Sequence, residues 1–319
     1  MESNRSIVQK IRKLFFTVQS ILMTRALRNL LNELHIVLVD VGAAGGIEPR
    51  WKKISPLLYY IGFEPDSKAT TEERQTKFAE HTLFSVALGA KKSKQKFYIS
   101  KGIGKSSIYR PNYSFLKNFA DVGRFQIENE IELYVDSIDQ VIAQKIDFIK
   151  LDTQGSELSI LTGSKNSLIS VFGVEVEVEF LEIYSNQPLL SSVHKLLSES
   201  GFEFIDFINL SRWERNIYSG LGQLVHADAL FLKTPETISN NNLCMADLKK
   251  YLAILFLYNR FDLLEKMFLV YPNLKNEVKH FYKFQNRKRK KQRKINYFIR
   301  LVNAALSNFG VELKTHLLY

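Results

Sequence analysis

The spacing of apolar residues changes near residue 36. Between residues 6 and 34 they recur every three to four positions, which predicts one amphipathic helix or two in series. After residue 36 the apolar residues form short runs, rich in Val, Ile and Leu, that end in turn residues. Such runs are typical of buried parallel strands. They occupy residues 36–42, 58–65, 82–89, 147–155 and 171–180.

Helical spacing returns between these runs, at residues 66–80, 156–170 and 188–200. Strands that alternate with helices in this way form a doubly wound α/β sheet, in which helices cover both faces. Two late runs, 201–210 and 228–233, have no helical pattern between them, so we expect these strands to be antiparallel.

The stretch from residue 90 to residue 146 is less regular. Residues 94–100 and 131–137 have the composition of two further strands, with a loop rich in Gly, Ser and Asn between them. We expect these strands to be additions to the main sheet.

The composition changes again after Pro235, where helical patterns cover residues 243–270 and 273–319. A cluster of Pro, Thr, Ser and Asn favours a boundary near residue 237. The sequence therefore predicts three segments: helical residues 1–35, an α/β domain over 36–236, and a basic helical extension over 237–319.

The composition excludes several classes of protein. Of the 319 residues, 45% are hydrophobic and 24% are charged, which is globular and not disordered. The single cysteine, Cys244, excludes an internal disulfide and a structural zinc site built on several thiolates. No apolar run is long enough to span a bilayer, and residues 1–35 lack the features of a secretory signal. We therefore expect a cytoplasmic protein.

The net charge of +11 is local. Residues 241–319 hold 16 Lys and Arg against 5 Asp and Glu, so the rest of the chain is neutral overall. Eight of these cations lie within residues 283–294, which contain no acid. This segment is interpreted as a solvated helix, a contact with the anionic inner face of a membrane, or a nucleic-acid contact. We expect cofactor binding to survive its removal.

The segment VDVGAAGG, residues 39–46, carries the clearest chemical signal. A strand runs into Gly42 and a series of small residues, which would let the backbone approach a ligand. Glu64 follows the next strand, 22 positions after Gly42, at the spacing where an acid reaches a ribose hydroxyl. The GxGxxG pattern of nicotinamide enzymes is absent. S-adenosylmethionine suits the carboxylates of Asp40 and Glu64, because its sulfonium and amino groups are positive.

Several motifs occur in the order found in FkbM-type methyltransferases, and the chain resembles that family over residues 36–235. They are VDVGAAGG, FEPD (63–66), ALG (87–89), VDSID (135–139), FIKLDTQGSEL (148–158), GVEVEVEF (173–180) and GQLVHADALFLK (222–233). The resemblance implies a Rossmann-like class I methyltransferase sheet and S-adenosylmethionine-dependent O-methylation. Many members act on sugars, glycans or polyketide hydroxyls.

The resemblance also implies positions for the cofactor. It puts Asp40, Gly42 and Gly46 at the methionine end, with Ala43 in the same turn, and Glu64 on the ribose. Asp66, Ala87 and Leu88 would lie near the adenine. The chain departs from the family pattern at Ala44, where Asn is frequent, and at Gln154, where Glu is frequent.

Methyl transfer to a hydroxyl needs a group that accepts the hydroxyl proton. Asp152 ends a strand at the edge where open sheets bind ligands, and Glu157 follows in the first turn of the next helix. Each also has a structural interpretation, as a turn residue or as a favourable charge at a helix start. His226 is a third candidate, and an ordinary core or surface histidine is its alternative.

Three glutamates alternate with valines over residues 174–179, which predicts either a solvated strand face or side chains that project into the site. Glu179, with Glu182 just beyond, is the better functional candidate because it lies near the carboxyl end of the strand. Asp152 with Glu177 or Glu179 could hold Mg²⁺, although the sequence leaves the metal undecided. Trp213 and Tyr218 lie in a loop suited to stacking on a sugar, or in a plain surface loop.

The favoured function is an S-adenosylmethionine-dependent O-methyltransferase that acts on a sugar or glycan hydroxyl, such as that of a lipid-linked polysaccharide. The alternatives are a nicotinamide oxidoreductase, a non-catalytic tether with a methyltransferase-like domain, and an RNA methyltransferase guided by the basic segment. The sequence leaves the oligomeric state and the acceptor open.

Overall fold

The computed structural model describes residues 21–44, 46–65, 75–215, 220–240 and 243–287, together with residues 290, 294 and 297. Glu33–Ile254 form one compact unit, and the described residues before and after them form a second unit. The Glu33–Ile254 unit, called the larger unit below, thus extends past the boundary expected near residue 237. The three-segment division of the chain stays a prediction.

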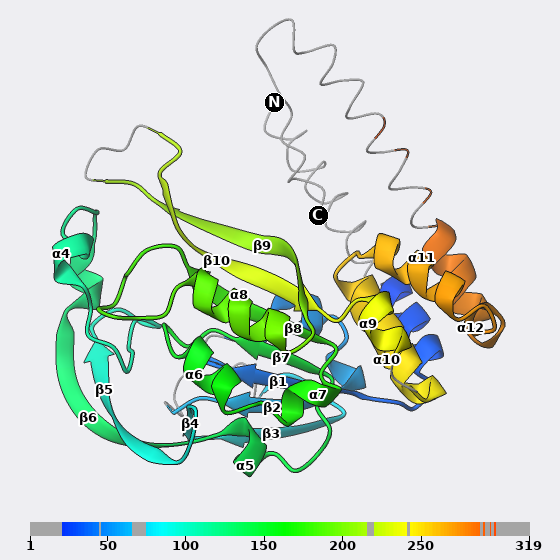
Figure 1. The fold of residues 1–319 in the computed structure, drawn as a ribbon, viewed down its shortest axis with the longest axis horizontal. Helices are drawn as coiled ribbons and strands as arrows, with labels where there is room; N and C mark the ends of the chain where they lie inside the picture. The colour runs from blue at the N-terminus through cyan, green and yellow to red at the C-terminus, as the bar shows by residue number, and fades with distance from the viewer. Residues whose placement is uncertain are drawn as a thin grey trace, which may run out of the picture. The chain divides into compact units, whose positions relative to one another are not determined.

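The larger unit is built on a seven-stranded sheet with the order β3-β2-β1-β7-β8-β10-β9 (Figure 1). All neighbouring strands are parallel except at β10, which is antiparallel to both β8 and β9. This confirms the doubly wound sheet and the antiparallel late strand. The strands are β1 (Ile36–Val41), β2 (Leu58–Phe63), β3 (Glu80–Phe84), β7 (Phe148–Leu151), β8 (Gly173–Glu179), β9 (Glu203–Trp213) and β10 (Gln223–Leu232).

The run expected as one strand over residues 82–89 is two strands in two sheets. It ends β3 at Phe84 and then forms β4 (Ala87–Leu88), which pairs with β6. A second sheet has the order β4-β6-β5, with β5 (Ser93–Ser100) and β6 (Ile127–Asp136) antiparallel. Periodicity could not show the break, because strand partners are chosen by contacts far along the chain.

The segment that joins β5 to β6, residues 101–126, is called the insertion below. It holds α4 (Tyr113–Leu116) and a 3₁₀ turn at Val122–Phe125.

Four short helices cover one face of the main sheet (Figure 1). The helix expected over residues 156–170 is split into two of them, at Gly163. A Cβ at Gly163 would lie 2.3 Å from the carbonyl oxygen of Gly89, so the chain passes close to its neighbour there and α6 ends. The helices are α5 (Ile138–Val141), α6 (Glu157–Thr162), α7 (Ser167–Ser170) and α8 (Leu190–Glu199). Of the helix expected at 66–80, residues 66–74 lie outside the described residues.

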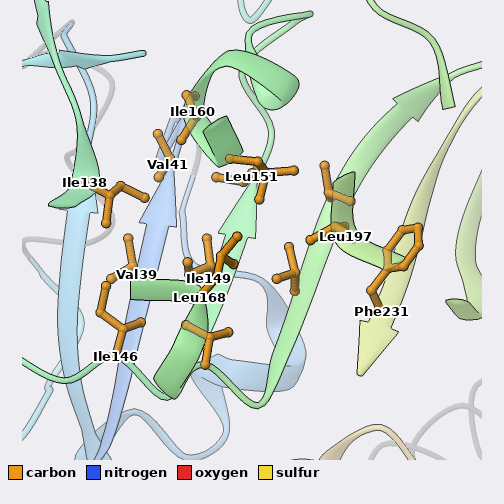
Figure 2. Packing of buried hydrophobic residues seen from close by; sticks show 14 of the residues in the cluster. Val39, Val41, Ile138, Ile146, Ile149, Leu151, Ile160, Leu168, Leu197 and Phe231 are labelled. Atoms are coloured by element: carbon orange, nitrogen blue, oxygen red, sulfur yellow. The ribbon is translucent and has the colours of Figure 1, made fainter. Parts of the chain in front are cut away.

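The two faces of the sheet differ in chemistry. Val39 and Val41 of β1, Ile149 and Leu151 of β7, and the valines of β8 point to the helix-covered face and form the main core (Figure 2). Because side chains alternate along a strand, Asp40 and the glutamates of β8 point to the other face. There, α2 (Pro49–Lys52) packs Trp51 on Phe148, with ring centroids 4.9 Å apart. A 3₁₀ turn, Ser55–Leu57, leads from α2 to β2.

Helices also lie before and after the sheet, while residues 1–20 and 298–319 lie outside the described residues. Residues 21–31 are helical, and α9 (Pro235–Ser239), α10 (Met245–Leu257), α11 (Phe261–Val270), α12 (Leu274–Glu277) and a helical stretch over 279–287 follow the sheet. Within the second unit, Phe256 packs against Phe281 with centroids 5.2 Å apart. Among the described residues, no helix is long and apolar enough to cross a membrane. Of the basic segment 283–294, the structure describes only 283–287, 290 and 294.

Gly42→Ala should destabilise the larger unit by more than about 2 kcal/mol, since it combines backbone strain with a steric clash. Gly42 has a φ of +81°, and a Cβ there would lie 1.9 Å from the carbonyl oxygen of Asp152. Gly104→Ala is the control: its φ is +67°, but a Cβ would meet nothing within 4 Å. Urea unfolding of both variants measures the difference. Equal losses would show that the contact between β1 and β7 is not the constraint.

Candidate active site

The turn after β1 lies against the end of β2. The backbone N–H groups of Gly42 and Ala43 both donate to the carbonyl oxygen of Phe63, at 2.9 and 3.2 Å. Glu64 follows directly and is half-buried, with its N–H bonded to Phe84. The structure therefore brings Gly42, Ala43 and Glu64 to one edge of the sheet, where the parallel strands end and where open α/β sheets bind ligands.

Gly46 has a φ of +104°, a conformation that side chains rarely adopt. Gly45 and Asp66 lie outside the described residues. Leu88, in β4, is 5% exposed and belongs to the main core, while Ala87 beside it is half-buried. Their predicted place beside an adenine ring stays a prediction.

The side chain of Asp40 is buried. Asp40 lies in β1, two residues before Gly42. Tyr60 donates its hydroxyl to Asp40 Oδ2 at 3.1 Å, and Lys150 Nζ lies 3.7 Å from Oδ1. Burial raises the pKa of Asp40, although Lys150 and Tyr60 oppose the rise. The protein itself thus partners this carboxylate. Its direct contact with a cofactor stays a prediction.

Lys150 of β7 carries a positive charge that lies between the carboxylates of Asp40 and Asp152. Burial lowers the pKa of its ammonium. The charges of Asp40, Asp152 and Glu175 raise that pKa by more than burial lowers it, so the net shift is upward. Asp152 Oδ2 lies 3.8 Å from Lys150 Nζ, and the Asp152 side chain is 43% exposed. Asp152 is therefore the member of this group that faces solvent. The sequence signal for Lys150 was a single lysine within an apolar strand.

Arg50 of α2 pairs with Glu175 of β8, with Nη1 and Oε2 3.0 Å apart. The Glu175 side chain is 2% exposed. This ion pair holds α2 on the charged face of the sheet. No local pattern predicts this pair, since the two residues are 125 positions apart.

The glutamates of β8 are buried, so a solvated strand face is wrong. Glu177 and Glu179 are 7% and 3% exposed, and Glu157 at the start of α6 is 2% exposed. Burial and the charge of Glu177 raise the pKa of Glu157 to about 7. The pKa of Glu177 is also raised, and that of Glu179 is raised well above its usual value, by burial first and by the neighbouring carboxylates second. Glu182, the other candidate, is exposed.

Glu157 is held by the turn before its helix. Its Oε1 accepts hydrogen bonds from the backbone N–H and the hydroxyl of Thr153, at 2.7 and 2.9 Å. The first-turn position expected from sequence therefore also makes Glu157 a capping acceptor for its own loop.

His226 of β10 reaches the same cluster. Its Nδ1 lies 2.7 Å from Glu177 Oε1, and its side chain is 18% exposed. With Nδ1 donating to the carboxylate, the neutral ring keeps a lone pair on Nε2 that can accept a proton. The indole of Trp213 stands edge-on to this ring, with centroids 6.0 Å apart. His226 was predicted as a candidate from its sequence context, but its partner Glu177 was not, because the pairing of β8 with β10 depends on residues far apart in the chain.

Gln154 connects the cluster to the insertion. Its Nε2 donates to Glu177 Oε2 at 2.7 Å, and its Oε1 accepts from the hydroxyl of Tyr184 at 3.1 Å. Its backbone oxygen accepts from the Ser107 hydroxyl at 2.6 Å, and its φ is +58°. The amide thus gives Glu177 a donor on the oxygen that His226 does not use. A glutamate at this position would place a second carboxylate there instead.

In the part of the chain that the structure describes, no group of three or more His, Cys, Asp or Glu residues is arranged to hold a metal ion. The suggested Mg²⁺ site has no such group among these residues.

A family model for the methyltransferase FkbM domain matches residues 40–204, which is more than half of the chain. This chain belongs to the FkbM methyltransferase family. The matched region begins at Asp40, within β1, and extends past β8 to the start of β9, so it contains the Gly42 turn, Asp152, Glu157 and Glu177. The family relationship confirms the Rossmann-like class I methyltransferase sheet, and it implies S-adenosylmethionine as the methyl donor.

Individual relatives are distant. The 2-O-methyltransferase NoeI of Sinorhizobium fredii is 25% identical over 203 residues, which cover 60% of this chain and 82% of NoeI. The crystal structure of FkbM from Methylobacillus flagellatus shares 15% identity over 62% of this chain and 43% of its own, with a TM-score of 0.36. This FkbM family chain therefore spans less than half of the Methylobacillus protein. The protoporphyrin methyltransferase ChlM of Synechocystis matches 68% of the chain and 80% of its own at 9% identity, with a TM-score of 0.32.

Glu157→Gln should make stability less dependent on pH. The folded-state pKa of Glu157 is raised to about 7, so its folded form binds more protons than the unfolded form. The stabilisation that Glu157 contributes to the wild type is therefore fully present below about pH 4.5. It is lost as pH rises through about 7. Glutamine keeps the acceptor for Thr153 and carries no charge. The stability of the variant relative to wild type should rise by roughly 2 kcal/mol between pH 5 and pH 8.

Denaturant unfolding at several pH values measures this effect. Glu182→Gln changes an exposed carboxylate just after β8 and is the control. Its stability relative to wild type should show no such trend with pH. A Glu157→Gln difference that stays constant with pH would contradict the buried-carboxylate assignment.

Proposed function

We propose that this protein transfers a methyl group from S-adenosylmethionine to a hydroxyl of a sugar or glycan. The observation that carries the proposal is the His226–Glu177 pair at the same sheet edge as the Gly42 turn. A cofactor and a proton acceptor are both needed for this reaction, and open α/β sheets bind ligands at that edge. The name of NoeI, a 2-O-methyltransferase, supports oxygen as the acceptor atom.

In this proposal the cofactor lies over the turn that contains Gly42, Ala43 and Gly46. Glu64 would accept hydrogen bonds from the ribose hydroxyls. Asp66, Ala87 and Leu88 would line the adenine end. The partly exposed carboxylate of Asp152 and the buried Asp40 give this edge a negative potential, which favours a sulfonium cation.

His226 is the proposed proton acceptor. The hydroxyl oxygen of the acceptor forms a bond to the methyl carbon as the bond from that carbon to sulfur breaks, and S-adenosylhomocysteine leaves. The hydroxyl proton goes to Nε2 of His226. Glu177, bonded to Nδ1, then stabilises the imidazolium, as a buried carboxylate does for a catalytic histidine.

The other carboxylates are proposed to support this pair. The pKa of Glu179 is raised well above its usual value, which favours its protonated form near neutral pH and makes it a weaker candidate for the first proton acceptor. Glu157, with a pKa raised to about 7, has one oxygen held by the backbone N–H and hydroxyl of Thr153. They keep the charge of the cluster low, so that Glu177 is the carboxylate that holds His226. Asp152, the most exposed of the group, remains a second candidate base.

We also propose that the basic segment 283–294 contacts an anionic membrane surface at the periphery, and that it is separate from the cofactor site. The support is its charge, eight Lys and Arg with no acid. This would place a cytoplasmic enzyme near a lipid-linked glycan.

Glu64→Ala should weaken S-adenosylmethionine binding about tenfold or more, because a charged acceptor for the ribose hydroxyls is lost. Isothermal calorimetry measures the affinity. Glu80→Ala changes an exposed acid at the opposite end of the neighbouring strand and should leave the affinity unchanged. Equal binding by wild type and Glu64→Ala would contradict the placement of the cofactor.

His226→Ala should slow methyl transfer by about 10²- to 10⁴-fold while S-adenosylmethionine still binds, since the proton acceptor is removed and the cofactor turn is unchanged. Transfer of tritiated methyl from the cofactor to a panel of sugars and glycans measures the rate. His194→Ala, an exposed histidine of α8, is the control. A His226→Ala enzyme as active as wild type would move the base to Asp152.

A further inference from the structure

Two arginines, Arg124 and Arg215, have no carboxylate partner among the residues that the structure describes. In the larger unit, Arg50 pairs with Glu175 and Arg110 pairs with Glu130. Within the described residues, no ion pair involves Arg124 of the insertion or Arg215 after β9. Arg212 of β9 also forms no ion pair among these residues, so what distinguishes Arg124 and Arg215 is their contact with aromatic rings.

Both arginines lie on aromatic rings. The guanidinium of Arg124 is 4.8 Å from the ring centroid of Trp213, and Arg215 is 5.3 Å from that of Phe119. Phe119 and Trp213 meet edge to face at 5.6 Å, and a backbone bridge joins Phe119 to Arg215. These four residues, which we call the aromatic–arginine cap, therefore form one cluster from two distant segments. Phe119 is buried beneath it, Trp213 and Arg124 are half-buried, and Arg215 is exposed and donates to Gln223 Oε1 at 3.3 Å.

The cap adjoins the proposed base. Trp213 stands 6.0 Å from the His226 ring, centroid to centroid. The guanidinium of Arg124 also lies 5.1 Å from the ring centroid of Phe125, which meets Tyr184 edge to face at 6.0 Å, and the hydroxyl of Tyr184 contacts Gln154. Arg124 is half-buried, and its Nε is buried without a hydrogen-bond partner. A cation in this position can offer its remaining donors to a bound group.

We infer that the aromatic–arginine cap is an acceptor subsite for a saccharide that carries an anionic substituent, a carboxylate or a phosphate. This inference rests on the proposed function. The half-buried indole of Trp213 suits the apolar face of a sugar, and the guanidinium groups suit a planar or tetrahedral oxyanion. The reacting hydroxyl would face His226, and the anion would face Arg124 and Arg215, away from the carboxylate cluster.

The chain offers a matched control. Arg212 is also in β9 and donates to the carbonyl oxygen of Gly222 at 3.4 Å. It precedes Trp213 by one position, so its side chain points to the opposite face of the strand. Replacing Arg212 therefore removes the same charge without touching the cap.

Trp213 provides the readout. The chain has two tryptophans, and Trp51 is fully buried. Titration of the full chain with D-glucuronate, glucose 1-phosphate and neutral D-glucose should change the fluorescence of Trp213, and Trp213→Phe should abolish the change. We expect at least one anionic probe to bind about tenfold more tightly than glucose, and added salt to weaken it. The stronger of the two anionic probes identifies a carboxylate or a phosphate.

Arg124→Met and Arg215→Met keep the apolar stem and remove the charge. Each should raise the Kd of the anionic probe about tenfold, and Arg212→Met should not. Thermal unfolding of the three variants checks that they are folded, and Arg215→Met tests the inference by itself if Arg124→Met is unstable.

Three outcomes would overturn the inference: glucose binds as well as both anions, Arg212→Met weakens binding as much as the cap variants, or no probe saturates by about 20 mM. Calorimetry with S-adenosylmethionine on the same protein separates the two proposals. Cofactor binding without any anion preference rejects the subsite alone, and failure to bind the cofactor rejects the proposed function.

Discussion

Burial of charge at the carboxyl ends of neighbouring strands is the constraint on which the site depends. Lys150 lies between Asp40 of β1 and Asp152 at the end of β7, and its single ammonium offsets part of their negative charge. An unpaired charge in this layer would cost several kcal/mol, so each member fixes the position of the others. The register of β1 with β7, Asp40 opposite Lys150, follows from this requirement. The Gly42 turn follows β1 and lies against the backbone of Asp152 at the end of β7, so the same pair of strands sets its position.

A second set of buried charges is not neutralised in the same way. Glu157, Glu177 and Glu179 gather where β8 ends, and their raised pKa values record both burial and mutual repulsion. Such a cluster lowers stability, and perturbed carboxylates of this kind concentrate at functional sites. Glu177 alone has partners on both oxygens, His226 and Gln154. The insertion supplies the contacts that hold Gln154, so an addition to the sheet sets the geometry of a residue inside it.

The same insertion meets β9 through the aromatic–arginine cap. Two parts of the chain that lie outside the β1–β2 half of the sheet thus approach one histidine. The two regions therefore suit different ligands. The ends of β1 and β2 suit a cofactor, and the insertion with β9 and β10 suits an acceptor. Variation in the insertion would then change the acceptor without disturbing the cofactor turn.

The strands, the reversed β10 and the small-residue turn were determined by the sequence, because hydrophobic periodicity and glycine act over a few neighbouring residues. Asp152, Glu157 and His226 were also identified there, as residue types at strand ends and helix starts. Tertiary structure decided what these groups contact. The His226–Glu177 pair, the Arg50–Glu175 pair and the break of residues 82–89 into β3 and β4 all depend on which strands become neighbours. Pairing between distant strands is set by burial and charge across the whole sheet, and a local pattern contains no information about it.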